Sequence, residues 1–382
     1  MADMDTYTEL RQLLHRTPER SGQEAGTAAT ILNYLEATHP QQLITGLGGH
    51  GIVAIYSGRT EGPRVLVRCE LDALPIPETT DLSYRSASDG VSHKCGHDGH
   101  MTILVGLAAR LKAQPPERGS VILLYQPAEE TGEGAARVLD DPGFEAAKPD
   151  KVVALHNLPG FPLGQVVLRD AVFASASSGM RICLHGQTSH AAEPEAGTSP
   201  ALAVAQLVQI FSAAPQFYTA LHEAAKVTVI HARVGEIAFG TSPGEGHVMV
   251  TLRSHAQDVL DRLMSKITEL ARGVAATHNL EATIESVEPF PSTVNDPTVV
   301  KVIEDSAKTL GMATHRPDQP FAWSEDFGHF TAKYPGALFG LGAGEAHPAL
   351  HHPDYDFPDT LLAPAVELLD TIVRRLQGED DV

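Results

Sequence analysis

The sequence predicts an α/β protein in which a buried sheet is flanked by helices and a second domain is inserted into the first. Three observations support this prediction. The chain has 382 residues, which exceeds the usual size of a single compact core. Short apolar runs alternate with helical stretches over the first part of the chain, and from Gly179 onward the order of elements changes. We therefore expect two domains of different architecture.

The strands of the first domain are expected at apolar runs without polar alternation, because a strand buried on both faces needs no polar side. One helix is expected to open with a capping box of Ser21 and Glu24 and to continue to about Leu35, and another is expected over residues 101–111. The expected strands are residues 52–56, 64–69, 121–125, 152–155 and 337–341. Strands that alternate with helices favour a sheet covered on both faces.

The second domain is predicted from a βαββαβ order of elements. Its first helix is expected to be capped at Ser199 with Pro200 at the first position, and the first domain resumes at a helix capped by Asp296 and Pro297. The other expected elements are strands at 180–184, 226–232, 247–252 and 282–287 and a helix at 258–276. This order is that of a ferredoxin-like domain. We place it at residues 177–288, which leaves residues 1–176 and 289–382 for a discontinuous first domain.

Composition and charge disfavour several classes of protein. The formal net charge of -20 would repel a polyphosphate backbone, so we expect no nucleic-acid partner. The chain has no apolar run long enough for a membrane span, and its N-terminal segment lacks the basic-then-apolar order of a secretion signal. Three cysteines, an odd number, do not make a disulfide framework. We expect a cytoplasmic protein without a membrane partner, in which at least one thiol is free to bind a metal.

Polar clusters at or just beyond the apolar strand runs are the candidates for chemistry. In open α/β sheets, ligands bind at the carboxyl ends of the strands, so clusters that follow different strands are expected to converge. The clusters are Glu70 with Asp72, residues 126–130, His156 and residues 347–352.

Residues 93–100 bring three histidines, a cysteine and an aspartate together at the start of a predicted helix. Thiolate and imidazole are ligands of zinc-like cations, and two nearby glycines let the backbone bend around one ion. For Cys95 and His97 together we favour metal binding over an ordinary polar helix start. Asp98 is expected to be a helix cap, whereas His93 and His100 fit ligation and a supporting position equally well.

Glu129 and Glu130 follow an apolar strand run and a proline, where solvent exposure is not the default. Consecutive side chains diverge, so one carboxylate can bind a metal while the other faces a water molecule. Metal-assisted hydrolysis requires this division of labour.

Single histidines elsewhere are weaker candidates. Taken alone, His156 and His190 are more typical of structural histidines than of functional ones. At most two of His347, His351 and His352 can serve one site.

Taken together and in order, these motifs resemble the M20 metallopeptidases over nearly the whole chain. The resemblance is specifically to the amidohydrolase branch that contains N-acyl-amino-acid, hippurate and indoleacetyl-amino-acid hydrolases. The segments that carry it are residues 68–75, 95–98, 126–130, His156, residues 186–194 around His190, residues 324–327 and residues 350–353.

The resemblance implies a metal centre with a general base. Glu129 would be the base, His190 would stabilise the oxyanion, and Asp72 would support the ligands without binding metal. The ligands of two divalent cations, drawn from manganese, zinc, cobalt and nickel, would be Cys95, His97, Glu130, His156 and His351. The resemblance also implies a zinc-peptidase-like catalytic domain, an inserted lid that forms a homodimer, and a small N-acyl or N-aroyl amino acid as substrate.

Two segments depart from the pattern of that family. Glu70 stands where relatives have aspartate, which lengthens the acid by one methylene. Residues 240–246 read Gly-Thr-Ser-Pro-Gly-Glu-Gly where relatives place Asn-x-x-Pro.

Arg253 is our candidate for holding a substrate carboxylate, although an arginine at a strand end is equally typical of a surface charge.

Three alternative functions have some basis in the sequence. A dipeptidase or carboxypeptidase of the same family would use the same ligands. A catalytically silent metal-binding protein is disfavoured because it has no need of Glu129 beside the ligands. Residues 240–244 match the G-x-S-x-G nucleophile elbow of serine hydrolases, but the elbow needs a backbone N–H after its serine and Pro243 has none.

Overall fold

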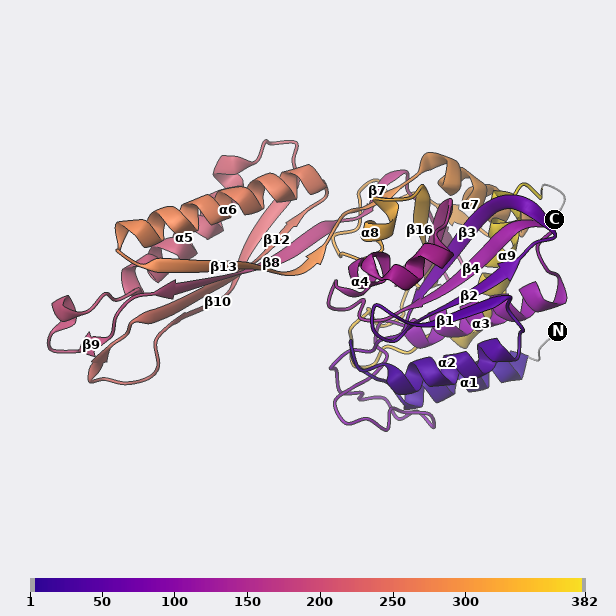
Figure 1. Ribbon diagram of the computed structural model, residues 1–382, viewed down its shortest axis with the longest axis horizontal. Coiled ribbons are helices and arrows are strands. Elements are labelled where there is room, and N and C mark those ends of the chain that lie inside the picture. The colour runs from indigo at the N-terminus through magenta and orange to yellow at the C-terminus, as the bar shows by residue number, and fades with distance from the viewer. Residues whose placement is uncertain (1–3, 380–382) are drawn as a thin grey trace. The chain divides into compact units, whose positions relative to one another are not determined.

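The computed structural model describes residues 4–379, which divide into two compact units (Figure 1). The first unit comprises the chain up to residue 173, residues 293–320 and the chain from residue 325. The second unit comprises residues 174–292 and 321–324. Each unit has its own hydrophobic core, as expected of a domain.

A mixed sheet of eight strands forms the centre of the first unit. β3 pairs in parallel with β4 and β5, and β5 pairs in parallel with β16, whereas β1, β2 and β6 each have an antiparallel neighbour. In order across the sheet the strands are β1 (Gln42–Leu47), β2 (Gly51–Ser57), β4 (Arg118–Gln126), β3 (Thr60–Glu70), β5 (Lys151–Pro159), β16 (Gly336–Gly344), β6 (Val166–Val167) and β15 (Thr314–His315). Each strand expected from the sequence lies inside one of these, and the mixed α/β fold is confirmed.

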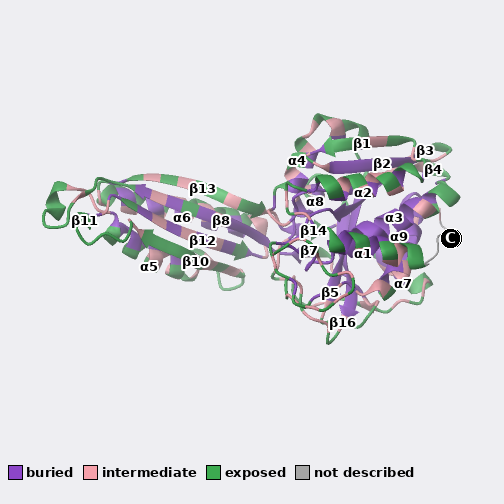
Figure 2. Ribbon diagram, turned by 90° about the horizontal axis from the view of Figure 1, so that it is seen from below, coloured by how far each residue is buried: buried purple, intermediate pink, exposed green. Residues whose placement is uncertain are grey.

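The helix that leads away from the candidate ligands, α3 (His97–Ala113), is the most enclosed helix of this unit. Residues 97–108 are all buried, because α3 packs against β3 on one side and contacts α1 and α9 on others (Figure 2). The other helices of the unit are α1 (Met4–Arg16), α2 (Ala25–Glu36), α4 (Gly134–Asp140), α7 (Pro297–Thr309), α8 (Gly328–Thr331) and α9 (Leu362–Leu376). Short 3₁₀ turns cover Pro142–Ala147 and Asp359–Leu361, and β7 (Ala171–Ala174) pairs with β14 (Thr293–Asn295).

The predicted capping box of Ser21 and Glu24 is wrong, because both side chains bond elsewhere. The Ser21 hydroxyl donates to the carboxylate of Asp72 (2.6 Å), and the Glu24 carboxylate accepts from the backbone N–H groups of Gly22 and Ala128 (both 2.8 Å). Tertiary contacts have displaced a local motif at this helix start.

Of the two caps expected for later helices, one is found where it was expected. Asp296 caps α7 by accepting from the backbone N–H groups of Thr298 (2.8 Å) and Val299 (3.2 Å), as expected. The helix expected to be capped at Ser199 instead starts at Ala201, with Pro200 in the capping position.

The second unit is a four-stranded antiparallel sheet in the order β10-β12-β8-β13. Alternate residues of β8, including Ile182 and Leu184, pack with Phe211 and Ile267 of the helices in one core, so both helices cover the same face. Its elements are β8 (Ala176–His185), α5 (Ala201–Tyr218), β10 (Ala225–Val234), β12 (Glu245–Ser254), α6 (Gln257–Thr277) and β13 (Glu281–Phe290), with a 3₁₀ turn at Pro194–Ala196 and a two-stranded pairing of β9 (Ser189–His190) with β11 (Thr241–Ser242).

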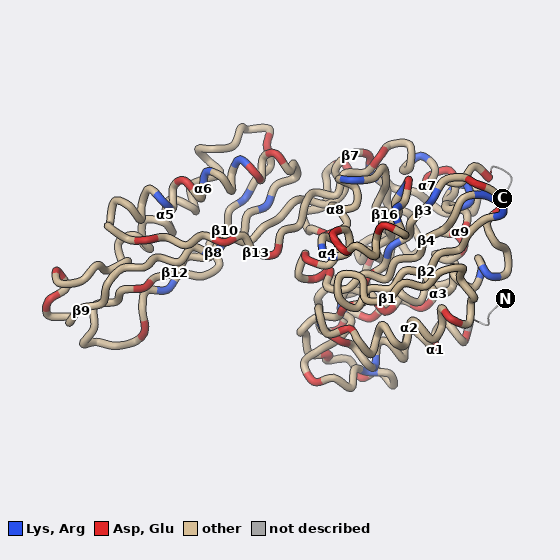
Figure 3. Tube along the Cα trace, viewed as in Figure 1, with Lys and Arg blue, Asp and Glu red and all other residues tan. Residues whose placement is uncertain are grey.

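None of the helices in the described part of the chain is both long and apolar enough to cross a membrane. Lysine and arginine are scattered along both units and do not gather in one stretch (Figure 3).

Candidate metal centre

The five ligands expected from the sequence come from four segments of the first unit. Cys95 and His97 lie at the start of α3, Glu130 follows β4, His156 lies in β5, and His351 follows β16. Because β3, β4, β5 and β16 run parallel to one another, their carboxyl ends share one edge of the sheet, and the segments that follow them meet there.

The side chains of these segments form overlapping groups of ligand atoms. In each group the atoms lie within 4.8 Å of one another. One group is Cys95, His97 and His156, a second is Cys95, Glu130 and His351, and a third is His97, Glu129 and Glu130. Sγ of Cys95 lies 3.4 Å from Nε2 of His156, and Nε2 of His351 lies 3.7 Å from a carboxylate oxygen of Glu130. The three groups share members, which is the arrangement that two adjacent ions require.

Backbone carbonyls set the tautomers of two of the histidines. Nδ1 of His97 donates to the carbonyl of Asp72 (2.8 Å), and Nδ1 of His156 donates to the carbonyl of Asn157 (2.9 Å). A neutral imidazole that carries its proton on Nδ1 presents a lone pair on Nε2. Nε2 of His97 therefore faces Glu129 and Glu130, and Nε2 of His156 faces Cys95.

Two buried acceptors at the centre have no hydrogen-bond partner among the described residues. They are Nε2 of His97 and Oε1 of Glu130, which lie 3.9 Å apart. A buried acceptor without a partner costs about 1–3 kcal/mol, so natural proteins rarely leave one. A cation between them would satisfy both, and the donor set therefore fits a metal ion.

The electrostatics favour cations as well. Burial, followed by the nearby carboxylates, raises the pKa of Glu129 and Glu130 well above the usual range, and burial and Glu130 raise that of Cys95. Arg68 supplies a permanent positive charge at the site. It pairs with Glu70, Glu325 and Asp326, and the carboxylates of Asp72, Glu129 and Glu130 also lie at the site. This surplus of buried carboxylates over buried cations is what divalent ions would neutralise.

Two residues at the site have left-handed backbone angles that are uncommon outside glycine. Ala128, which precedes Glu129, has φ 51°, and His351 has φ 65°. His351 is held there by a hydrogen bond from its N–H to the carbonyl of Lys94 (2.7 Å). Non-glycine residues in this region cluster at functional sites, where the surrounding structure compensates the strain.

Comparison with known proteins identifies the family. Residues 66–375 match the sequence model of Peptidase family M20/M25/M40. The chain belongs to this family. The resemblance found in the sequence is thereby confirmed, and with it the assignment as a hydrolase of the M20 amidohydrolase type.

Two curated relatives of this M20 chain are bacterial deacetylases. It is 30% identical to the N-acetyl-L-cysteine deacetylase of Bacillus subtilis (strain 168), over 97% of this chain and 88% of the relative. It is also 30% identical to the N-acetyldiaminopimelate deacetylase of Geobacillus thermodenitrificans (strain NG80-2), over 92% and 93% of the two chains.

Solved structures share the fold. A putative aminohydrolase from methicillin-resistant Staphylococcus aureus superimposes with a TM-score of 0.88 at 24% identity, over 98% of this chain and 97% of the other. A Bacillus subtilis protein described as a dinuclear metal-binding peptidase of the M20 family gives a TM-score of 0.82 at 24% identity, over 98% of both chains.

The other polar residues of the 93–100 segment have separate roles in the M20 chain. His100 uses both ring nitrogens: Nδ1 donates to Glu70 (2.7 Å) and Nε2 accepts from the N–H of Asn157 (3.3 Å), so it orients neighbours although it lies close to His97. Neither nitrogen of the buried His93 finds a partner in the described structure. The prediction that Asp98 caps the helix is wrong, since Gly96 occupies that position and Asp98 pairs with His15 (2.7 Å) inside the first turn.

Of the three histidines beyond β16, His351 is the one that enters a ligand group among the described residues. Nε2 of His347 donates to the carbonyl of Asp356 (2.6 Å), and the exposed His352 accepts from the N–H of Asp354 (3.1 Å). Asp72 lies beside the ligands, with one carboxylate oxygen bonded to Ser21 (2.6 Å) and to the N–H of Glu130 (3.0 Å).

His190 and Arg253 lie in the second unit. His190 is exposed in β9, and its Nδ1 accepts from the N–H of Ala192 (3.1 Å). Arg253 of β12 donates to the hydroxyl of Ser324 (3.1 Å) and to the carbonyl of Ala322 (3.3 Å). Ser242 lies in the short strand β11 and not at a strand-to-helix turn, which agrees with the exclusion of a nucleophile elbow.

The cluster behind Glu129 was given no role from the sequence, although its members lie in residues 68–75 and 324–327, two of the segments that resemble the family. Arg68 is fully buried and pairs with Glu70, Glu325 (2.8 Å) and Asp326. The carboxylates of Glu325 and Asp326 lie within 4.8 Å of that of Glu129. The available signal was an acid pair placed directly before an apolar phenylalanine, where exposure is again not the default.

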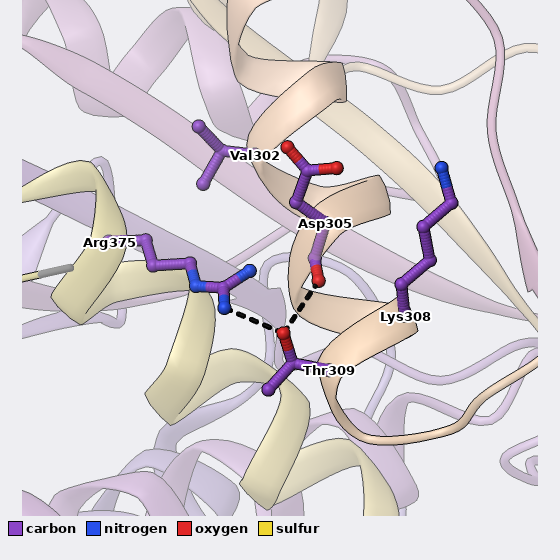
Figure 4. A pocket seen from close by; sticks show the side chains of 5 residues that line it. All are labelled: Val302, Asp305, Lys308, Thr309 and Arg375. Carbon is purple, nitrogen blue, oxygen red and sulfur yellow. Dashed lines mark hydrogen bonds between the residues drawn. The ribbon is translucent and has the colours of Figure 1, made fainter. Parts of the chain in front are cut away.

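A groove between α7 and α9 is lined by residues other than the candidate ligands. It is lined by Val302, Asp305, Lys308, Thr309 and Arg375, and Arg375 donates to the hydroxyl of Thr309 (2.7 Å; Figure 4). Its lining includes neither a histidine nor a cysteine, so it does not compete with the metal centre as the catalytic site.

Proposed function

We propose that this protein is a metal-dependent amidohydrolase that releases the amino acid from small N-acyl or N-aroyl amino acids. The observation that carries the proposal is the convergence of five candidate ligand side chains, with Glu129 alongside, where Nε2 of His97 and Oε1 of Glu130 are buried and have no hydrogen-bond partner among the described residues. The activities for which the two relatives are named, deacetylation of N-acetylcysteine and of N-acetyldiaminopimelate, support the same class of substrate.

The metal centre in this proposal holds two divalent cations. The Bacillus subtilis protein of similar fold, described as dinuclear, supports this number. Manganese, zinc, cobalt and nickel all accept a set of one thiolate, imidazoles and a carboxylate. The proposed ligands are Cys95, His97, Glu130, His156 and His351. When bound, the ions supply Lewis-acid polarisation of the amide carbonyl and lower the pKa of water.

Glu129 is the proposed general base. Its carboxylate lies 3.9 Å from Nε2 of His97, inside the ligand group and buried. Burial and Glu325 raise its pKa, which favours its taking a proton from the attacking water and returning it to the leaving amine. Asp72 holds the His97 side chain through its carbonyl and the Glu130 main chain through its carboxylate.

The second unit is proposed to be a ferredoxin-like lid, covering residues 177–288 of a chain whose remainder, 1–176 and 289–382, forms the catalytic domain. The strand order and the two helices on one face support this assignment. In the lid, His190 is proposed to stabilise the tetrahedral oxyanion and Arg253 to receive the substrate carboxylate.

The lid is also proposed to pair with its copy in a homodimer. β10 is an edge of the four-stranded sheet, and Ile230 on it is exposed. An open edge with apolar residues pairs readily with a second copy. Light scattering at assay concentration should give a dimer, and Ile230→Lys should shift it toward monomer. A monomeric wild type would remove the dimer from the proposal.

A substrate panel tests the function. The protein is loaded with each of the four metals and offered N-acetyl amino acids, N-benzoyl amino acids and dipeptides, with release of free amino acid as the readout. We expect metal-dependent release from the N-acyl substrates. Turnover of dipeptides alone would instead favour a dipeptidase, and a metal-loaded protein without turnover would favour a silent metal-binding protein. Glu129→Gln, loaded in the same way, is the matched control for background hydrolysis.

A further inference from the structure

A second cluster of buried charges lies beside the metal centre. Two side chains one turn apart on α1, Arg11 and His15, are both fully buried. Nδ1 and Nε2 of His15 bond to Asp98 (2.7 Å) and Glu78 (2.9 Å). Arg11 forms a two-bond contact with Asp359 (2.7 and 3.0 Å) and also donates to Asp356 (2.8 Å). Its guanidinium lies over the ring of Tyr84, 4.5 Å from the ring centre.

Lys94 extends the cluster. Its ammonium is buried and donates to Glu78 (2.6 Å) and to the carbonyl of Tyr355 (2.7 Å). The three cations Arg11, His15 and Lys94 thus face the carboxylates of Glu78, Asp98, Asp356 and Asp359. Both ring nitrogens of His15 face carboxylates, which is the geometry of an imidazolium.

This cluster joins the two segments that carry the candidate ligands at the start of α3 and beyond β16. Asp98 follows His97 directly, and Lys94 precedes Cys95 directly. On the other segment, the N–H of His351 donates to the carbonyl of Lys94 (2.7 Å), and Asp356 and Asp359 belong to the same stretch of chain. The charged network therefore contacts both segments without supplying a ligand.

A buried ionic network is a weak source of stability, since the cost of removing charges from water largely cancels their attraction. Such a network does fix geometry, because each bond restricts direction as well as distance. Groups that orient metal ligands from outside the coordination sphere change metal affinity by about 10- to 100-fold when removed.

We propose that Arg11 and His15 are positioning residues for the metal centre: they hold the segment of Cys95 and His97 against the segment of His351. This inference rests on the proposed function, because it assumes that these three residues bind the ions. The role is indirect, since neither Arg11 nor His15 belongs to a ligand group of the described structure.

The test uses cobalt as the probe in the full-length protein. Cobalt bound to a thiolate gives a charge-transfer band, which reports the bond to Cys95 directly. His15→Gln and Arg11→Lys are compared with wild type for that band, for the rate of cobalt loss to excess chelator, and for thermal unfolding. Arg374→Lys is the matched control, because Arg374 is also buried and pairs with Asp370 (3.0 Å) and the carbonyl of Gln114 (2.8 Å), outside the ligand-bearing segments.

We expect His15→Gln and Arg11→Lys to lose cobalt about 10- to 100-fold faster than wild type and to alter the thiolate band. The control should lower the unfolding temperature and leave both cobalt readouts at wild-type values. If the two α1 variants lose stability but keep wild-type cobalt release and spectrum, the network is only structural and the inference is overturned.

Two further outcomes are separable. Asp359→Asn weakens the network at its partly exposed rim, so it decides the question if the buried variants do not fold, with the same expected direction and the same overturning result. A wild type that binds no cobalt overturns the proposed function and this inference together, whereas normal binding in every variant overturns the inference alone.

Discussion

The imidazole of His97 is hydrogen-bonded to the main chain of Asp72, because its Nδ1 donates to the Asp72 carbonyl oxygen at 2.8 Å. The bond determines which nitrogen carries the proton, so Nε2 faces Glu129 and Glu130 as a bare lone pair. Asp72 itself follows β3 and binds the N–H of Glu130 through its side chain (3.0 Å). One residue thereby sets the direction of a histidine and the position of a glutamate that come from different segments of the chain.

Metal removal is the first prediction. Because the donor set combines a thiolate, imidazoles and buried carboxylates, prolonged chelation should abolish hydrolysis, and divalent cations should restore it. Activity is measured on protein whose metal content has been verified by elemental analysis. Undiminished turnover in metal-free protein would refute the dinuclear mechanism.

Replacement of the proposed base is the second prediction. Glu129→Gln keeps the size of the side chain and removes its basicity, so kcat should fall by about two to four orders of magnitude while bound metal remains. Turnover and metal content are measured on the same preparation. Near-normal turnover would assign Glu129 to structure.

The third prediction concerns His190. If it stabilises only the oxyanion, His190→Ala should lower kcat by roughly two to three orders of magnitude and leave metal content unchanged. Loss of a metal ion from this variant would make His190 a ligand. Full kcat would make it an ordinary exposed histidine.

The fourth prediction concerns the glycine between two ligands. Gly96 has φ 93°, and a Cβ there would lie 2.3 Å from Oδ1 of Asn157 and 2.9 Å from the hydroxyl of Tyr355. Gly96→Ala should lower the free energy of unfolding by at least about 2 kcal/mol, through backbone strain and this clash, and should reduce metal content. Gly90 is the matched control, since its φ is also positive (66°) and a Cβ there meets nothing described within 4 Å. Equal effects of Gly90→Ala and Gly96→Ala would rule out the clash.

The fifth prediction is a pH dependence of stability that involves His15. Burial alone would lower the pKa of His15, but the hydrogen bonds that its ring donates to Asp98 and Glu78 outweigh burial and raise the pKa to about 9 from 6.5. The stabilisation is therefore complete below about pH 6.5 and is lost as pH rises through 9, with an upper limit of about 3 kcal/mol. The groups that face the ring are Arg11, Glu78, Tyr84, His93, Asp98 and Asp356.

Denaturant unfolding between pH 6 and pH 10, at equal metal loading, measures this effect. Wild type should lose stability across that interval more steeply than His15→Gln. Tyr84 and His93 do not titrate there, because burial raises the pKa of Tyr84 to about 12 and lowers that of His93 to about 3. Parallel pH profiles for the two proteins would contradict an imidazolium at this position.

The strands were predictable because apolar runs report burial on both faces. The run at 152–155 became β5 and the run at 337–341 became β16, each with a few more residues at its ends. Periodicity says little about where an element stops, since the ends of β5 are set by its partners β3 and β16.

The candidate site residues could be proposed from the sequence by their chemistry, whereas their contacts could not. Ser21 looked like a helix cap because the local pattern fits one, yet its hydroxyl serves Asp72, which lies far along the chain. Asp98 was likewise expected to cap a helix, but its carboxylate bonds to His15 instead. The partners of Glu325 could not be predicted from its own segment, because Arg68 and Glu129 are both distant in sequence. Interactions that join remote segments are invisible to patterns read within a short window.

The position of β16 between β5 and β6 has a consequence for synthesis of the protein. On the ribosome, β5 emerges before the whole second unit, whereas the strand that covers its free side emerges after that unit. Until then β5 presents an unsatisfied row of peptide groups and apolar side chains, the kind of surface that associates with wrong partners. Four of the five candidate ligands are translated in that first stretch, so the nascent chain carries most of a metal centre long before His351 arrives to close it.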